Sequence, residues 1–260
     1  VTVVMFDENQ ILTTEQFWEA QILEHYRNQA KAAENHIVLD KQLRMQADPI
    51  TMDWIDSFTK KGQLKEIPHT VDGYQIKVFD DPEMLDLEIQ KKAKEKDSAL
   101  SRVLATYDWE YSQKRKPDDR LRAYWEVVIG KWHKPWNREL GTQLSRQAKR
   151  RISGLAWAEQ QQTINEVGST FTIQGFDLNY AGVILGPSVK YRNGKIIFAP
   201  SESHNNKAIR NRTLSDGTKQ KFGEMLIQHE VRVLMTRGVN GMYIYACDPE
   251  LRAALLKAAK

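Results

Sequence analysis

Short apolar runs and longer polar-apolar periods alternate along this chain. Strand-like apolar runs occur at 3–6, 36–39, 74–79, 102–106, within 171–186, and at 195–199 and 242–247. Apolar residues at helical spacing predict helices over 13–33, 49–58, 82–97, 219–228 and 249–259. Residues 108–157 have the least regular pattern, and the polar stretch 201–217 is expected to be a mobile loop. Strands alternating with helices predict an α/β fold with a mostly parallel sheet covered by helices.

Three helix starts are marked by local signals. Thr13 followed three residues later by Gln16 is a capping-box pattern. Asp81-Pro82 and Asp248-Pro249 each place a capping carboxylate directly before a proline at the first helical position. These pairs predict sharp helix beginnings at 82 and 249.

Composition excludes several classes of protein. Of 260 residues, 41% are hydrophobic and 28% charged, which excludes collagen, disulfide scaffolds and wholesale disorder. The net charge of +4 is compatible with an anionic partner. The lone Cys247 cannot form an internal disulfide, and no signal peptide or membrane-spanning apolar run occurs. We expect a cytoplasmic protein without a membrane partner.

The chain begins with Val1 inside an apolar run, directly before a polar turn. This pattern is typical of a core strand cut from a longer chain. The alternative is a mature protein whose own first strand lies in its sheet. The sequence leaves both interpretations open.

Two short segments combine an apolar run with groups suited to phosphate or magnesium. Acidic side chains in Phe6-Asp7-Glu8-Asn9-Gln10 could orient Mg²⁺ or water if the turn follows a buried strand at the ligand-binding edge of a sheet. Leu39-Asp40-Lys41-Gln42-Leu43-Arg44 ends in arginine, whose planar guanidinium suits phosphate. Taken alone, each segment is better explained by an ordinary polar turn or a surface arginine.

Two later segments have comparable chemistry. Gly168 to Asp177 places small hydroxyl residues around glycine, which lets a phosphate approach the backbone; the alternative is an ordinary glycine turn. In Val231 to Gly238, Arg237 follows an apolar helix, and it needs an anion only if it points inward.

Together, the four segments resemble motifs III, IV, V and VI of superfamily 1 helicases. More specifically, the chain resembles the Schlafen group 3-like DNA/RNA helicase domains, a bacterial family of unassigned function. The phrases Thr172-Ile173-Gln174-Gly175-Phe176-Asp177-Leu178-Asn179-Tyr180 and Leu234-Met235-Thr236-Arg237-Gly238 carry this resemblance best. It spans nearly the whole chain, although 108–160 and 190–217 contribute little.

The resemblance implies a RecA-like three-layer α/β domain with an irregular, helix-rich insertion at about 108–160. Residues 1–36 would be the last strand and helix of a truncated first RecA-like domain, and 37–260 the second. The chain would be the C-terminal part of a nucleic-acid-dependent NTPase. A missing N-terminal RecA-like domain would be its partner.

The resemblance also implies roles for individual residues around ATP. Gln10 would sense the γ-phosphate, and Arg44 and Arg237 would neutralise its developing charge. Gly175 and Asp177 would hold the nucleotide, and Asp7 would help to bind the cofactor. Thr170 or Thr172 would contact the nucleic-acid backbone.

Two elements that such an ATPase needs are absent from these 260 residues. No G-x-x-x-x-G-K-[ST] loop occurs. The strand ending in Asp-Glu that places Mg²⁺ is also absent, unless Phe6-Asp7-Glu8 is that element rather than motif III. The chain alone should therefore be inactive, with ATP and Mg²⁺ bound only together with the missing domain. The alternative is a non-catalytic RecA-like module that binds nucleic acid or a protein.

Aromatic and basic residues gather within the irregular segment. Trp132 and Trp136 lie beside Lys131 and Lys134, and stacking faces with cations are what single-stranded DNA or RNA requires. Burial in the core is the equally weighted alternative for both indoles. The six histidines are scattered, and no metal site is expected.

Overall fold

The computed structural model describes residues 3–39, 45–69, 73–117 and 123–260. Its centre is a five-stranded, all-parallel sheet in the order β1 (Gln75–Val78), β11 (Gly238–Ala246), β6 (Leu178–Leu185), β2 (Arg102–Ala105) and β5 (Val167–Gly168). The mixed α/β architecture with a mostly parallel sheet is thereby confirmed, and it is consistent with a RecA-like fold.

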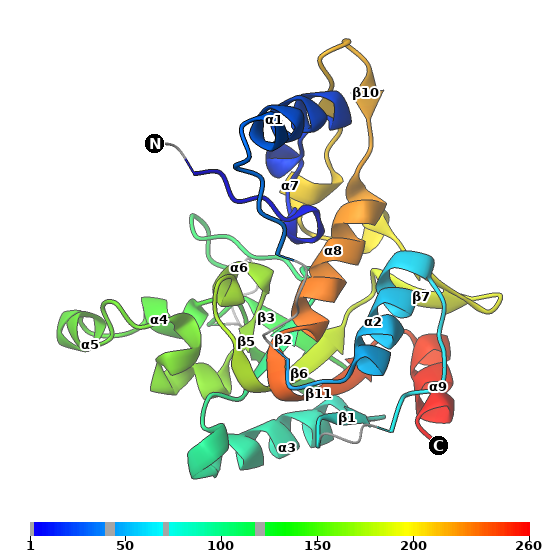
Figure 1. The fold of residues 1–260 in the computed structure, drawn as a ribbon. Helices are drawn as coiled ribbons and strands as arrows, with labels where there is room; N and C mark the ends of the chain where they lie inside the picture. Colours follow the sequence, from blue (N-terminus) through cyan, green and yellow to red (C-terminus); the bar gives the residue numbers. More distant parts are fainter. Residues whose placement is uncertain (1–2, 40–44, 70–72, 118–122) are drawn as a thin grey trace.

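Helices cover both faces of the sheet, which gives three layers (Figure 1). One face packs against α2 (Pro49–Lys61), α8 (Gly223–Met235) and α9 (Pro249–Ala258). The other packs against α3 (Pro82–Lys94) and the hairpin of β3 (Glu126–Ile129) and β4 (Trp132–Pro135).

Alternate residues of the central strands serve the two faces, as the pleat requires. On β11, Met242 and Ile244 join the α2–α8–α9 core, whereas Tyr243 and Tyr245 join the α3 core. On β6, Gly182 lets α3 approach closely, because a Cβ there would lie 2.8 Å from Ile89.

The predicted Asp-Pro helix starts are confirmed. Asp81 accepts a hydrogen bond from the Glu83 N–H, and Asp248 accepts one from the Leu251 N–H, each with proline in the first turn. Helix α2 ends at Gly62, whose φ of +62° is the left-handed conformation that glycine adopts at low cost.

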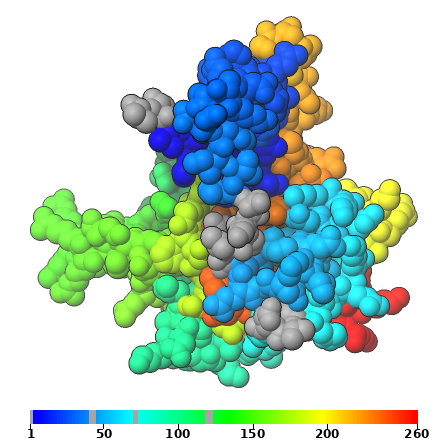
Figure 2. Space-filling model, in the orientation of Figure 1, coloured from blue at the N-terminus to red at the C-terminus, as the bar shows by residue number. Residues whose placement is uncertain are grey.

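A long excursion separates β2 from β5. Besides the β3–β4 hairpin it contains α4 (Glu139–Thr142), α5 (Arg146–Arg151) and the 3₁₀ segments η4 (Trp157–Glu159) and η5 (Gln161–Asn165). Helices α4 and α5 project sideways from the sheet (Figures 1 and 2).

The region after β6 is more ordered than the pattern indicated. Strands β7 (Val189–Arg192) and β8 (Lys195–Phe198) form an antiparallel hairpin, in which β7 was not predicted. The predicted mobile loop instead contains η6 (Pro200–Glu202), α7 (Asn206–Ile209) and β9 (Arg212–Thr213), which pairs with β10 (Lys219–Gln220). The helix predicted at 219 begins only at Gly223.

The N-terminal expectations are partly wrong. Val3–Phe6 form no strand, and Val3, Val4 and Met5 are 75–88% exposed, because no neighbouring strand pairs with them. The described residues of the second run, 36–39, are also exposed coil. The predicted helix over 13–33 divides into η2 (Thr14–Gln16), which has the expected capping box, and α1 (Ala20–Ala32).

The segment around η1 (Glu8–Gln10) and η2 attaches to the C-terminal half through a small apolar cluster. Ile11 packs with Ala208, Phe222 and Leu226, and the Phe17 and Phe222 ring centroids are 4.2 Å apart. The division of the chain at residue 36 stays a prediction.

The longest helices in the described residues have 13 residues, fewer than the roughly 20 that cross a bilayer.

Candidate functional site

Arg237 and Asp177 lie together although sixty residues separate them in sequence. The Arg237 Nη1 donates to the Phe176 carbonyl at 3.4 Å and lies 3.7 Å from Asp177 Oδ1. The Arg237 carbonyl accepts a hydrogen bond from the Leu178 N–H at 2.9 Å. The parallel pairing of β6 and β11 produces this contact, because Arg237 and Asp177 directly precede these two neighbouring strands.

The Arg237 side chain is almost fully enclosed, with 1% exposed, whereas that of Asp177 is 41% exposed. A buried guanidinium requires polar partners to offset its lost hydration, and the Phe176 carbonyl and Asp177 provide them.

Gly175 turns the chain just before this pair. Its φ is +80°, in the left-handed region, and no other atom lies within 4 Å of where a Cβ would be. Glycine is thus favoured here by backbone conformation rather than by lack of space. The exposed turn brings Phe176 and Asp177 over Arg237.

The Asp7–Gln10 pair lies on a different part of the molecule. The Gln10 Nε2 donates to Asp7 Oδ2 at 2.7 Å, and the Asn9 N–H donates to Asp7 Oδ1. Partial burial acts to raise the pKa of Asp7, but these hydrogen bonds and the nearby charge of Arg232 lower it overall. The turn lies against the middle of α8, where His229 Nδ1 is 2.9 Å from the Ile11 carbonyl oxygen.

The expected geometry for this turn is wrong in one respect. It does not follow a strand, since Val3–Phe6 are coil, and so it is not at the carboxyl edge of the sheet. Arg44 lies outside the described residues. Of the predicted phosphate-site residues that are described, the structure brings Gly175, Asp177 and Arg237 into one place, and Asp7 and Gln10 into another.

The two threonines belong to the short helix α6 (Thr170–Ile173), and both are buried. The Thr172 hydroxyl accepts from the Ser169 N–H and donates to the Ser169 carbonyl, both at 2.8 Å. Thr170 faces the carboxyl group of Glu230. The Thr172 hydroxyl is thus engaged within the protein, and contact of either threonine with a nucleic-acid backbone stays a prediction.

The two tryptophans differ in exposure. Trp136 is fully buried, and its ring centroid lies 5.4 Å from that of Tyr107 and 6.3 Å from that of Trp109. Base stacking on Trp136 would require the hairpin to leave the sheet. Trp132 is partly exposed, and its Nε1 is 3.4 Å from Asp86 Oδ2.

Two buried carboxyl groups were not predicted from the sequence: Asp108, which follows β2, and Glu230, on α8. Asp108 accepts from the Ser188 N–H at 2.9 Å and the Thr106 hydroxyl at 2.8 Å. Glu230 accepts from the Tyr107 N–H at 2.9 Å. Burial raises the pKa of Asp108, and burial together with the charge of Asp108 raises the pKa of Glu230 to about 8.

The sequence did contain a signal for Glu230. It interrupts the apolar face of α8 formed by Ile227, Val231 and Leu234, where a carboxylate is unexpected unless it has a partner. Asp108, three residues beyond β2, has no comparable signal. Neither pairs with enough further ligands for a metal: no group of three or more His, Cys, Asp or Glu side chains in the described ranges could hold an ion.

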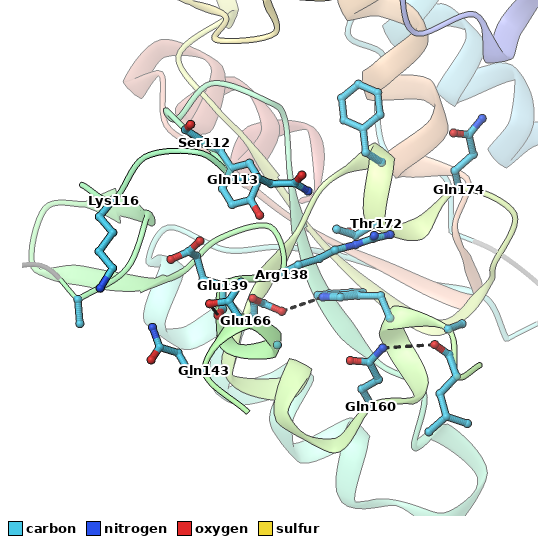
Figure 3. A pocket seen from close by; sticks show the side chains of 18 of the residues that line it. Ser112, Gln113, Lys116, Arg138, Glu139, Gln143, Gln160, Glu166, Thr172 and Gln174 are labelled. Atoms are coloured by element: carbon cyan, nitrogen blue, oxygen red, sulfur yellow. Dashed lines mark hydrogen bonds between the residues drawn. The ribbon is translucent and has the colours of Figure 1, made fainter. Parts of the chain in front are cut away.

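A cavity of about 740 Å³ opens between α6 and the excursion that follows β2 (Figure 3). Its lining mixes cations, carboxyl groups, amides and aromatic rings, and includes Arg115, Lys116, Arg138, Glu139, Glu166, Gln174 and Trp157. Thr172 and Phe176 from the predicted motif V also line it. The basic and aromatic character of this excursion is evident in the sequence, but the cavity is not.

Comparison with known proteins agrees with the motif resemblance. The model of the family described as Schlafen group 3, DNA/RNA helicase domain matches residues 1–248. An uncharacterized protein of Saccharomyces cerevisiae is 29% identical over 280 residues, covering 100% of this chain and 58% of that protein. The chain thus spans less than two thirds of this relative. No solved structure matches it.

Proposed function

This chain belongs to the Schlafen group 3, DNA/RNA helicase domain family, and we propose that it contributes the C-terminal part of a nucleic-acid-dependent NTPase. In this proposal Arg237 is the residue that stabilises charge on the transferred phosphoryl group. The P-loop and the Mg²⁺ ligands come from sequence outside these 260 residues, which contain no G-x-x-x-x-G-K-[ST] loop.

The observation that carries the proposal is the meeting of Arg237 with the Gly175–Asp177 turn. The resemblance assigns these residues to two motifs of one nucleotide site, and the contact at 3.4–3.7 Å supports that assignment. Phosphoryl transfer depends mainly on positioning and on cations that stabilise charge, so a guanidinium held by a neighbouring carboxylate has suitable chemistry.

The enclosure of Arg237 defines what activation would involve. Its guanidinium would exchange the Phe176 carbonyl and Asp177 for phosphate oxygens. Displacement of the exposed Gly175 turn would withdraw the Phe176 carbonyl and Asp177 from the guanidinium.

The test is ATP turnover by the protein expressed from its complete gene, comparing wild type with Arg237→Ala. Loss of an arginine finger lowers turnover by about 10³–10⁵-fold. Arg102→Ala is the matched control, because Arg102 is also a buried arginine at the amino end of a sheet strand. The Arg102 guanidinium donates hydrogen bonds to Thr163, Ala99 and Ser101, and none of these three residues is a predicted site residue.

Thermal melts of both variants separate lost stability from lost chemistry. We expect Arg102→Ala to retain turnover within a few-fold at a temperature where both variants are folded. Equal turnover by the two variants would mean that Arg237 does not take part in phosphoryl transfer.

One observation favours a second candidate, a non-catalytic module that binds nucleic acid or a protein. With 1% of its side chain exposed and Asp177 beside it, Arg237 already has the partners of a structural ion pair. If Arg237→Ala loses stability but not turnover, or if the complete protein turns over no ATP, this candidate is supported instead.

A further inference from the structure

The cavity described above is distinct from the Arg237 contact and is large enough for a small ligand. Its volume of about 740 Å³ lies within the range of roughly 300–1,000 Å³ typical of ligand sites. The segment 111–116, the start of α4, the segment 155–160 and α6 enclose it. Arg237 is not among its lining residues, although Phe176, whose carbonyl contacts Arg237, is.

The backbone beneath the cavity is held in an uncommon conformation. Asn137 and Arg138 have φ values of +59° and +80°, which non-glycine residues rarely adopt. The Asn137 N–H donates to the Val167 carbonyl at 2.9 Å, and the Ser169 hydroxyl donates to the Asn137 side-chain oxygen at 2.8 Å. Such strain persists where the surroundings impose it and is concentrated at binding sites.

This backbone aims Arg138 into the cavity. Figure 3 shows Arg138 over the centre of the cavity, between Glu139 and Thr172. Lys116 faces the cavity from the opposite side, and Arg115 also lines it. Arg115 is paired with Glu110 at 2.6 Å, whereas no ion pair to Arg138 or Lys116 occurs among the residues that the structure describes. The cavity thus presents two cations suited to an anionic group.

The acidic groups of the cavity are buried and internally bonded. Glu166 accepts from the Trp157 Nε1 at 2.8 Å and from the Leu140 N–H at 3.0 Å. Burial raises the pKa of Glu166 to about 7, with Glu139 adding to the effect, and burial also raises the pKa of Glu139. Near neutral pH, Glu166 is therefore partly protonated and opposes an anion less than an ionised carboxylate would.

The remaining lining suits a planar heterocycle. Tyr111, Phe171 and Phe176 line the cavity and are only partly buried, so they retain surface for stacking. Gln113, Gln143 and Gln174 are exposed at its rim, and amides pair with the donor and acceptor edges of bases. Trp157 forms a fixed wall: a Cβ on Gly168 would lie 2.6 Å from its ring.

We propose that this cavity binds one nucleotide unit, with its phosphate at Arg138 and its base among the aromatic and glutamine side chains. The unit is either a free mononucleotide or one nucleotide within a single strand, since both present the same chemistry. The proposal concerns binding only, so it stands or fails independently of ATP hydrolysis.

The test is equilibrium binding to this 260-residue chain. The probes are AMP, GMP, CMP and UMP, with ribose 5-phosphate and adenosine as half-ligands that lack the base or the phosphate. A fluorescein-labelled ten-nucleotide single strand distinguishes the two sources: tighter binding of the strand than of any mononucleotide assigns the site to a strand, and the reverse assigns it to a free nucleotide.

The variant is Arg138→Gly, because glycine adopts a φ of +80° without strain and the fold should persist. The control is Arg146→Ala. Arg146 is an exposed arginine on α5, close in sequence to Arg138, and it does not line the cavity. Alanine replaces it because glycine would destabilise the helix. We expect Arg138→Gly to weaken nucleotide binding at least tenfold and Arg146→Ala to change it less than twofold.

Three results would overturn the proposal. The first is no saturable binding of any nucleotide probe at millimolar concentration. The second is equal affinity for AMP and ribose 5-phosphate, which would indicate an anion site without base recognition. The third is equal weakening by the two arginine variants, which would indicate general electrostatic attraction.

Discussion

Glu230 provides a quantitative prediction because its carboxyl group is buried on α8 and faces Asp108. The substitution is Glu230→Gln, which keeps an oxygen to accept the Tyr107 N–H and removes the titratable proton. In the folded protein, burial and then Asp108 raise the pKa of Glu230 from 4.5 to about 8. Thr170 and the Tyr107 N–H, which stabilise the charged form, offset this only in part.

The sign of the pH dependence follows from proton binding. Between pH 4.5 and 8 the unfolded chain releases the Glu230 proton while the folded chain keeps it, so rising pH favours unfolding. Each pKa unit corresponds to about 1.4 kcal/mol. From pH 5 to pH 8 the free energy of unfolding of the wild type should therefore fall by about 4 kcal/mol through this group.

The assay is urea unfolding at pH 5, 6, 7 and 8, with the wild-type value subtracted from that of Glu230→Gln at each pH. Carboxyl groups that do not interact with Glu230 titrate alike in both proteins, so the difference reports Glu230 together with its coupled neighbour Asp108. We expect the variant to gain about 1.4 kcal/mol per pH unit relative to the wild type, as the pKa difference requires. Glu224→Gln, the same substitution at an exposed position on the same helix, is the matched control.

A flat difference curve for Glu230→Gln would refute the reasoning, because it would mean that the carboxyl group has the same pKa in the folded and unfolded chains. A curve that rises toward acid pH would mean that the charged form is the one stabilised by folding.

Three further predictions concern packing, capping and charge. Gly182→Ala should destabilise the protein by about 1–3 kcal/mol, because its Cβ would lie 2.8–2.9 Å from Ile89 and Leu85; chemical denaturation measures this, and an unchanged midpoint would mean that α3 shifts freely. Asp248→Ala should cost about 1–2 kcal/mol or more, since it removes the α9 cap and the Arg192 ion pair; thermal melts measure this, and a loss confined below 0.5 kcal/mol would contradict the capping role. Single-strand binding should weaken steeply as salt increases; fluorescence anisotropy measures this, and a flat salt response would exclude a basic binding surface.

Local sequence signals predicted the elements that local chemistry determines. The Asp81-Pro82 and Asp248-Pro249 pairs mark α3 and α9 because a capping carboxylate and a fixed φ act within one turn. The continuous apolar run at 242–247 locates most of β11, since both faces of this strand are buried. The run Val3–Phe6 is also apolar, but no neighbouring strand pairs with it. The residues of a run do not reveal whether a partner strand is present.

The candidate site was only partly predictable for a related reason. The motif resemblance placed Arg237 and Asp177 in one site, and the strand order of the sheet brings them into contact. The cavity joins residues from 111 to 176, so its existence depends on how the excursion folds back onto α6. The left-handed backbone of Arg138 has no local signal, since glycine or asparagine is the usual residue in that conformation.

The central claim is that this chain belongs to a nucleotide hydrolase that depends on nucleic acid. The most direct test is ATP turnover by the protein from its complete gene, measured with and without single-stranded DNA or RNA. The account predicts measurable turnover that rises several-fold or more when a strand is added. If the protein binds a single strand but turns over no ATP in either condition, the result would contradict the account and support the non-catalytic module.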